Sequence, residues 1–290
     1  MIEFRNVSFV YGENTPFEHD ALKNVSLTIE DNKVTGIIGH TGSGKSTLAQ
    51  MMNALIAPSE GQVLLDGKNI NENKEISYKT RFKVGLVFQY PEYQLFEESV
   101  FKDIAFGPKN MGLSDEEIKR RVLEAAEFTG IDGEMLKKSP FELSGGQKRR
   151  VAIAGTLAMD PEVLVLDEPA SGLDPKGKKE ILGGLINYNR KKKNALVIIS
   201  HSMEDIALYS DKIIALSDGS ILTQGSPEEV FSQYDKLKSS GLALPEISEL
   251  MHILKCRGID VDTSVFTVEK AFDILCPKLC KRKGTTAKEV

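Results

Sequence analysis

Residues 39–46 constrain the fold of this chain more than any other stretch. They read Gly-His-Thr-Gly-Ser-Gly-Lys-Ser and fit the pattern G-x-x-x-x-G-K-[S/T] of a phosphate-binding loop. Glycines let backbone N–H groups turn toward phosphate oxygens, and Lys45 adds a positive charge. We expect a short apolar strand at 34–38 and a helix at 46–55, a context that argues against an ordinary glycine-rich turn. The predicted phosphate-binding residues are Gly39, His40, Thr41, Gly42, Ser43, Gly44, Lys45, Ser46 and Thr47.

The remaining apolar pattern predicts an α/β fold with two kinds of sheet. Short β-branched runs are typical of parallel strands buried on both faces, and they occur at 34–38, 84–88, 163–167, 196–200 and 213–216. Alternating residues at 2–10 and 24–30, with a further strand at 61–66, indicate a smaller antiparallel sheet. A region from about 97 to 160 is expected to be helical, with Ser114 as an N-cap and Glu117 completing a capping box.

Two carboxylates follow one of the buried strands and point to metal and water chemistry. Asp167 is placed to bind Mg²⁺ through its water shell, with the Ser46 hydroxyl as a direct ligand. Glu168 would orient or deprotonate an attacking water. Gln89 ends another predicted strand and could reach both the metal and the water. On its own, an Asp-Glu pair at the end of a strand is usually exposed to solvent and has no catalytic role. The phosphate-binding loop earlier in this chain favours the catalytic interpretation.

Further motifs resemble the ATP-binding-cassette ATPases. Leu143-Ser144-Gly145-Gly146-Gln147 resembles the signature of that family, the stretch from Ser171 to Asp174 resembles its D-loop, and His201 resembles its switch histidine. The resemblance covers residues 1 to about 225. It implies a RecA-like P-loop core with an antiparallel β-subdomain, a helical signature subdomain at about 90–160, and a small C-terminal dimerisation domain at 226–290.

The resemblance also implies a head-to-tail dimer that encloses two ATP molecules with Mg²⁺. In such a dimer Ser144, Gly145, Gly146 and Gln147 contact the ATP of the partner chain, which is either identical or a paralogue. Glu168, His201 and Gln89 would be catalytic, and Ser171 and Asp174 would lie at the dimer interface. Tyr11 matches the aromatic residue that stacks on adenine, the alternative being a strand-end tyrosine that packs on the β-subdomain.

The stretches 89–98 and 103–108 narrow the resemblance to the ATPase subunits of energy-coupling factor transporters, which take up vitamins or transition-metal ions. The pair His40-Thr41 and the stretch 16–19 are more similar to the second of the two ATPase subunits. This implies a transmembrane coupling subunit, a separate substrate-binding membrane subunit, and a peripheral location on the cytoplasmic face of the cell membrane. The predicted coupling residues, which could instead form the core of the helical subdomain, are Tyr93, Leu95, Phe96 and Phe101.

Charge and hydropathy restrict the alternatives. The net charge of −5 gives no reason to expect nucleic-acid binding, and no apolar run approaches the roughly 20 residues of a membrane span, so work at a membrane would require a partner. The ATPase of a binding-protein-dependent importer, a soluble cassette ATPase and a non-catalytic binding module remain alternatives. Near the C-terminus, Ile247, Leu250, Met251 and Leu254 form an amphipathic stripe that could pack on its own cassette or join two chains.

Overall fold

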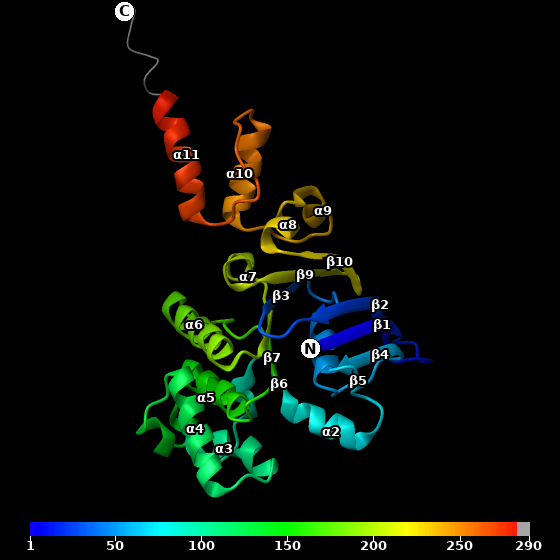
Figure 1. The fold of residues 1–290 in the computed structure, drawn as a ribbon, viewed down its shortest axis with the longest axis vertical. Coiled ribbons are helices and arrows are strands. Elements are labelled where there is room, and N and C mark those ends of the chain that lie inside the picture. Colours follow the sequence, from blue (N-terminus) through cyan, green and yellow to red (C-terminus); the bar gives the residue numbers. More distant parts are fainter. Residues whose placement is uncertain (283–290) are drawn as a thin grey trace, which may run out of the picture.

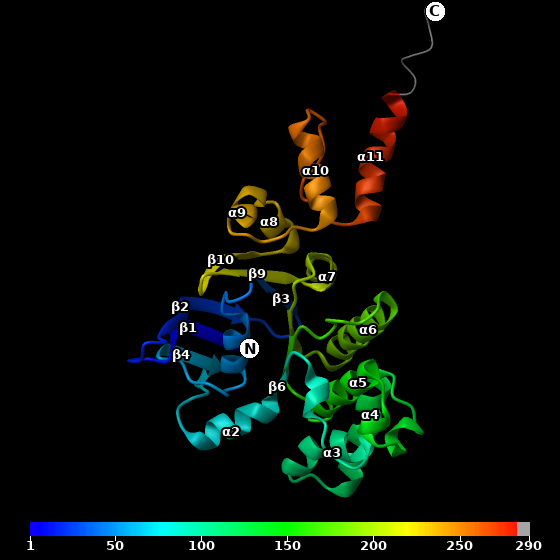
Figure 2. The ribbon, with the colours of Figure 1, turned by 180° about the vertical axis from the view of Figure 1, so that it is seen from behind.

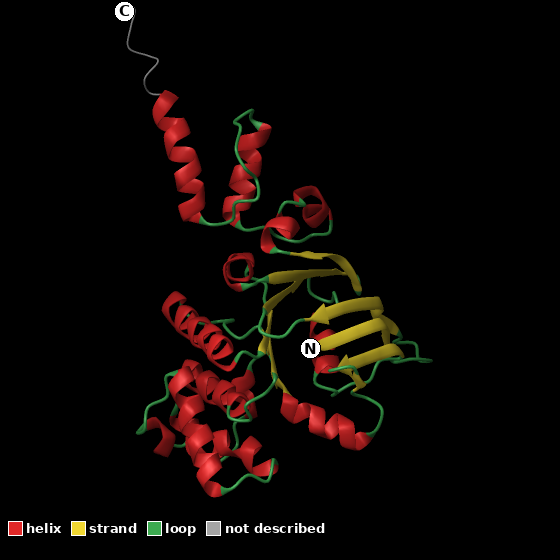
Figure 3. Ribbon diagram, in the orientation of Figure 1, coloured by secondary structure: helices red, strands yellow, loops and turns green. Residues whose placement is uncertain are grey.

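The computed structural model describes residues 1–282 and contains two β-sheets flanked by helices (Figure 1, Figure 3). The larger sheet has the strand order β10-β9-β3-β8-β7-β6. Its strands are β3 (Val34–Gly39), β6 (Val84–Val87), β7 (Val163–Asp167), β8 (Ala195–Ile199), β9 (Lys212–Ser217) and β10 (Ser220–Gly225). All are parallel except β10, which pairs antiparallel with β9. The predicted parallel sheet is confirmed, whereas β10 was not predicted because its half-buried, partly polar residues lack the apolar run of the other strands.

The smaller sheet is antiparallel and lies beside the larger one (Figure 3). It consists of β1 (Ile2–Tyr11), β2 (His19–Ile29), β4 (Glu60–Leu65) and β5 (Lys68–Asn69), in the order β2-β1-β4-β5. The prediction placed the start of β2 at residue 24, which is wrong, since the strand begins at His19. Register shifts interrupt the pairing of β1 with β2, and these irregularities disturb the alternation on which the prediction relied.

Helices cover both faces of the central sheet and form a separate group beside it. The helices before residue 212 are α1 (Lys45–Met52), α2 (Lys74–Lys83), α3 (Val100–Asn110), α4 (Asp115–Thr129), α5 (Gly145–Leu157), α6 (Pro175–Lys192) and α7 (Met203–Tyr209). Short 3₁₀ turns occur at η1 (Pro91–Gln94), η2 (Met135–Lys137) and η3 (Pro140–Glu142).

Ser114 caps α4 as predicted, because its hydroxyl accepts the N–H of Glu117. The predicted capping box is nevertheless only half formed. The Glu117 carboxylate accepts hydrogen bonds from Arg120 and Arg121 instead of returning to the backbone of Ser114. Charged partners one turn away therefore replace the neutral backbone donor.

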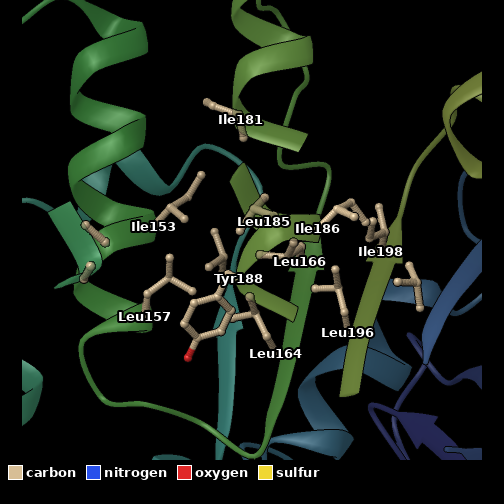
Figure 4. Close-up of a cluster of buried hydrophobic side chains, with 14 of the residues drawn as sticks. Ile153, Leu157, Leu164, Leu166, Ile181, Leu185, Ile186, Tyr188, Leu196 and Ile198 are labelled. Carbon is tan, nitrogen blue, oxygen red and sulfur yellow. The ribbon is translucent and has the colours of Figure 1, made fainter. Parts of the chain in front are cut away.

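The central sheet separates two apolar cores. Along β7, Leu164 and Leu166 pack toward the helical side, whereas Val163 and Val165 pack toward α1 and the antiparallel sheet. Figure 4 shows the first of these cores, where residues of α5 and α6 meet β7 and β8. Burial on both faces explains why these strands are uniformly apolar and why the sequence predicted them well.

The C-terminal helices divide into two packing groups. They are α8 (Pro227–Phe231), α9 (Tyr234–Ser239), α10 (Glu246–Cys256) and α11 (Val268–Arg282). Val230, Phe231 and Leu237 of α8 and α9 belong to the helical-side core of the cassette, and Leu244 is the last of its buried residues in chain order. Phe266 also packs against this core, 6.3 Å from the ring of Phe231. Helices α10 and α11 extend side by side beyond β10 (Figure 1, Figure 2). Within the region predicted as one domain from residue 226, α8 and α9 thus pack on the cassette, whereas α10 and α11 have a core of their own. The boundary at residue 226 stays a prediction.

The C-terminal unit has a small core of its own, formed by Met251, Val261, Val265 and Ala271. In the predicted amphipathic stripe, Met251 is buried and Ile247 and Leu254 pack against it. Leu250 is 42% exposed and does not join this core, so the stripe is narrower than predicted. Residues 283–290, which the prediction included in this domain, lie outside the described residues. Within the part of the chain that the structure describes, no helix combines the length and the apolarity needed to cross a membrane.

Candidate active site

The functional side chains gather at one edge of the central sheet. Strands β3, β6, β7 and β8 run parallel, so their carboxyl ends lie along the same edge, where open α/β sheets bind ligands. A cavity of about 380 Å³ opens there. It is lined by Tyr11, His19, Ala21, Thr41, Gly42, Gly44, Lys45, Ser46, Thr47, Gln89, Asp167, Glu168 and His201.

The loop between β3 and α1 contains two glycines with positive φ, Gly42 and Gly44, followed by the buried Lys45. Gly44 has φ +98°, and a Cβ there would lie 2.5 Å from the carbonyl oxygen of Ala21, so no other residue fits without a shift. The Lys45 Nζ donates to the carbonyl oxygens of Gly39 and His40, both at 2.8 Å. Burial lowers the pKa of Lys45. The loop thus places a desolvated cation at the start of a helix, a combination that favours phosphate.

Oxygen donors suited to Mg²⁺ face the same cavity. The Ser46 hydroxyl donates to Asp167 Oδ2 at 2.8 Å, which brings the predicted direct ligand next to the predicted carboxylate. Burial raises the pKa of Asp167, and the hydrogen bond from Ser46 opposes that rise. Gln89, exposed at the end of β6, lines the cavity with them. A hydroxyl, a carboxylate and an amide oxygen are the ligand types that Mg²⁺ prefers.

Glu168 occupies an unusual position between the sheet and His201. Its backbone φ is +53°, a left-handed conformation that its N–H stabilises by donating to the carbonyl of Ile199 at 3.0 Å. Its Oε1 is buried, finds no hydrogen-bond partner among residues 1–282, and lies 3.5 Å from Nε2 of His201. Burial, with the neighbouring Asp167, raises the pKa of Glu168 to about 7, and burial, with Lys45, lowers that of His201. A carboxylate of such basicity is suited to accept a proton near neutral pH.

His40 belongs to the loop, but its ring turns away from the cavity. Its Nδ1 must donate to the carbonyl of Thr41, 2.8 Å away, and its Nε2 must accept the N–H of Asp218, 3.4 Å away. The side chain of His40 therefore links the loop to the turn between β9 and β10.

Tyr11 lies on the rim of the cavity. Its hydroxyl is 3.3 Å from Thr47 Oγ1, and its ring packs edge to face with Phe9 at 4.8 Å. The Tyr11 ring is half-exposed, so its free face is accessible to a nucleotide base. Stacking on adenine stays a prediction. His19 and Ala21 also line the cavity and were not predicted, because only pairing of β2 with β1 brings them there.

Of the signature residues, Ser144 and Gly145 are exposed and Gly146 and Gln147 are half-buried, and none of the four is among the residues that line the cavity. The Ser144 hydroxyl accepts the N–H of Gln147 at 3.4 Å, and Gln147 Oε1 accepts the N–H of Ser144 at 3.0 Å, which completes a capping box at the start of α5. Asp174 caps α6 by accepting the N–H of Gly177. Ser171 lies in the turn that precedes Asp174. One chain thus presents a phosphate-type cavity and, separately, an exposed helix start.

The predicted coupling residues divide between core and surface. Leu95 and Phe101 are half-buried against the helical-side core. Tyr93 and Phe96 are 84% and 58% exposed. Phe96 packs edge to face with Phe106 at 4.9 Å, and Tyr93 lies near Tyr90. We name the four exposed rings, Tyr90, Tyr93, Phe96 and Phe106, the aromatic patch.

Known proteins resemble this chain in sequence over most of its length. The sequence profile of the ABC transporter family matches residues 22–171. The energy-coupling factor transporter ATP-binding protein EcfA2 of Caldanaerobacter subterraneus subsp. tengcongensis is 54% identical over 270 residues, which cover 93% of this chain and 94% of that protein.

Two solved structures extend the comparison to the fold. CbiO1 from Clostridium perfringens, described as part of the ABC transporter complex cbiONQ, superposes with a TM-score of 0.73 at 39% identity and covers 87% of this chain and 98% of its own. The ATP-binding cassette MJ0796, solved as a dimer in a post-hydrolysis state with ADP and Pi, gives a TM-score of 0.71 at 30% identity, covering 78% of this chain and 98% of its own. The chain therefore belongs to the ABC transporter family and is a transport ATPase of the energy-coupling factor type.

Proposed function

We propose that two cassettes close head to tail around ATP, with residues 144–147 of each chain completing the cavity of the other. The observation that carries this proposal is the separation, within one chain, of the phosphate-type cavity from the capped start of α5. The cavity at the sheet edge contains Lys45, Asp167, Glu168 and His201, whereas the exposed start of α5 lies elsewhere. One ATP molecule needs a single phosphate-binding loop from the chain that holds it. In a head-to-tail dimer, the start of α5 can contact the ATP bound by the partner. The dimeric state of MJ0796 supports this arrangement.

In this dimer the residues at the sheet edge have separate roles in binding and hydrolysing ATP. Lys45 and the loop before α1 bind the phosphates, and Tyr11 stacks on the base. Ser46, Asp167 and Gln89 would hold Mg²⁺, which when bound neutralises charge on the phosphates. Glu168 accepts a proton from the attacking water, and His201, 3.5 Å away, orients that carboxylate. The partner is a second copy or a paralogue, and either supplies the same signature residues.

We further propose that a transmembrane subunit docks an apolar helix on the aromatic patch. Phe96 is presented by a turn whose N–H groups at Phe96 and Glu97 are both accepted by the Asp103 carboxylate. Burying two such rings contributes roughly 3–6 kcal/mol before ordering costs. A separate membrane subunit selects the micronutrient, a vitamin or a transition-metal ion, and the cassette lies peripherally on the cytoplasmic face. The relationship to EcfA2 and to CbiO1 supports this assembly.

The decisive experiment replaces the two most exposed rings of the patch. Tyr93→Asp combined with Phe96→Asp should detach the chain from its membrane complex and abolish uptake, because neither charge can be buried against an apolar helix. ATP binding should persist, since neither residue lines the cavity. Tyr78→Asp, on exposed α2, is the matched control and should copurify normally. If the double variant still copurifies and supports uptake, the docking surface lies elsewhere.

A further inference from the structure

The signature helix carries a buried cation that the mechanism above does not use. Arg149 lies one turn after the start of α5, and its side chain is only 4% exposed. A buried guanidinium requires several acceptors, because each unpaired donor costs free energy. The partners of Arg149 therefore indicate what this residue connects.

Arg149 contacts two other functional segments at once. Its Nε and Nη2 donate to the two carboxylate oxygens of Glu92 at 3.1 and 3.0 Å, a bidentate pair that fixes the relative orientation of both groups. Its Nη1 donates to the carbonyl oxygen of Ser171. Glu92 lies in η1, which begins two residues after Gln89. Ser171 lies in the D-loop, so one side chain joins the signature helix, the segment after Gln89 and the D-loop.

The contacts continue from the D-loop to the hydrolytic carboxylate. The N–H of Ser171 donates to the carbonyl oxygen of Glu168 at 3.2 Å, within the turn that follows β7. A continuous series of hydrogen bonds thus runs from Glu92 through Arg149 and Ser171 to the backbone of Glu168. Tyr93, the most exposed ring of the aromatic patch, directly follows Glu92 in η1.

We infer that Arg149 is a positioning residue that conveys movement of the aromatic-patch segment to Glu168 and to the signature helix. The inference rests on the proposed function, in which a membrane subunit moves that segment. Displacing η1 would shift the Glu92 carboxylate, and the rigid guanidinium would carry the shift to Ser171. Lysine cannot replace it, since an ammonium group lacks the planar fork that serves two oxygens of Glu92 and a third acceptor together.

The test compares two neighbouring arginines of α5 in the assembled transporter. Arg149→Lys should lower kcat for ATP at least about tenfold with KM unchanged, because misplacement of catalytic groups affects turnover more than binding. It should also raise the number of ATP molecules hydrolysed per substrate imported. Arg150→Lys is the matched control, since Arg150 pairs with Glu180 and the carbonyl of Thr129, away from the cavity. Its kcat and its ATP-to-substrate ratio should stay within about twofold of wild type.

A second variant approaches the link from its other end. Glu92→Gln removes the ion pair with little change in shape and should reproduce the loss in kcat, and the double variant should be no worse than either single one. Wild-type kcat and wild-type ATP-to-substrate ratio in Glu92→Gln would overturn the inference, even if Arg149→Lys failed to fold. So would an equal loss in Arg150→Lys. A wild-type chain that does not copurify with membrane subunits would overturn the proposed function instead, and basal ATP hydrolysis by the same variants would then decide the role of Arg149.

Discussion

Glu168 combines burial, a left-handed backbone and a charged neighbour in a single residue. A non-glycine residue with positive φ costs on the order of 1 kcal/mol or more, and it persists only where the surrounding structure fixes it. The pairing of its N–H with Ile199 and of its carbonyl with Ser171 supplies that constraint. The conformation places the carboxyl at the cavity, where its raised pKa suits it to accept a proton from water near neutral pH.

The first prediction concerns this carboxyl in turnover. Glu168→Gln should bind ATP normally and hydrolyse it at least about a hundredfold more slowly, the usual effect of losing a general base. Glu162→Gln, an exposed position before β7 that pairs with Lys83, is the control and should turn over as wild type. Steady-state ATPase assays on the assembled complex measure both. Near-normal activity of Glu168→Gln would remove Glu168 from the catalytic role.

The second prediction concerns stability against pH. Since the folded-state pKa of Glu168 is about 7, above the ordinary 4.5, the unfolded chain loses this proton first as pH rises. Wild type should therefore lose stability relative to Glu168→Gln between those two pH values, at about 1.4 kcal/mol for each pH unit and by about 3 kcal/mol in total, with no further change above pH 7. Urea unfolding of the nucleotide-free proteins tests this. A difference that does not vary with pH would show that burial leaves this carboxyl unperturbed.

At the scale of elements, two capped helix starts allow a sharp comparison. Ser144 caps α5 and Ser114 caps α4 by the same side-chain contact, so replacing either costs about 1 kcal/mol in capping. Ser144→Arg should also fill the site for the partner's phosphate. It should keep ATP bound in its own cavity yet prevent ATP-dependent dimerisation, whereas Ser114→Arg should dimerise. Nucleotide-binding and light-scattering measurements decide the matter, and normal closure of Ser144→Arg would contradict the proposed head-to-tail arrangement.

The sequence predicts best those elements whose residues carry a local pattern. The parallel strands are apolar on both faces, and the loop before α1 has fixed glycine positions, so both could be read along the chain. Other features depend on pairing between distant segments. The contact between Arg149 and Glu92, the position of His19 at the cavity and the separation of half-buried Leu95 from exposed Phe96 all depend on tertiary packing. Charged residues such as Arg149 gave no signal, because most arginines on helices face solvent.

At the scale of the whole molecule, the C-terminal hairpin has a core of its own but also contacts the cassette, since the His252 ring stacks on Tyr234 at 3.7 Å and Phe266 packs against the helical-side core. Helices α10 and α11 share a small core, and Leu250, Ile253, Val268 and Phe272 remain exposed on them. Exposed apolar residues on a small unit are typical of a contact surface. The proposed role of this unit is to join two chains while the nucleotide sites are open.

A chain that ends at Leu244 tests that role without removing the buried residues of α8 and α9. It should remain folded and bind ATP, but it should be monomeric without nucleotide, whereas the longer chain should be dimeric. Leu250→Asp with Phe272→Asp should give the same result with the hairpin retained, since both side chains are exposed. Light scattering over a range of protein concentrations measures the oligomeric state. A shortened chain that stays dimeric without ATP would exclude the hairpin as the joining element.

The strand order of the central sheet also determines when the phosphate-binding loop can form during synthesis. Strand β3 ends at Gly39, but its two neighbours are β8, beginning at Ala195, and β9, beginning at Lys212. The strands β1, β2 and β4, by contrast, can pair once residue 65 has emerged. Such distant pairing slows folding and leaves apolar strands exposed in the growing chain. The most recognisable motif of this sequence is therefore made early by the ribosome and becomes competent to bind nucleotide only after the strands at 195–199 and 212–217 have emerged.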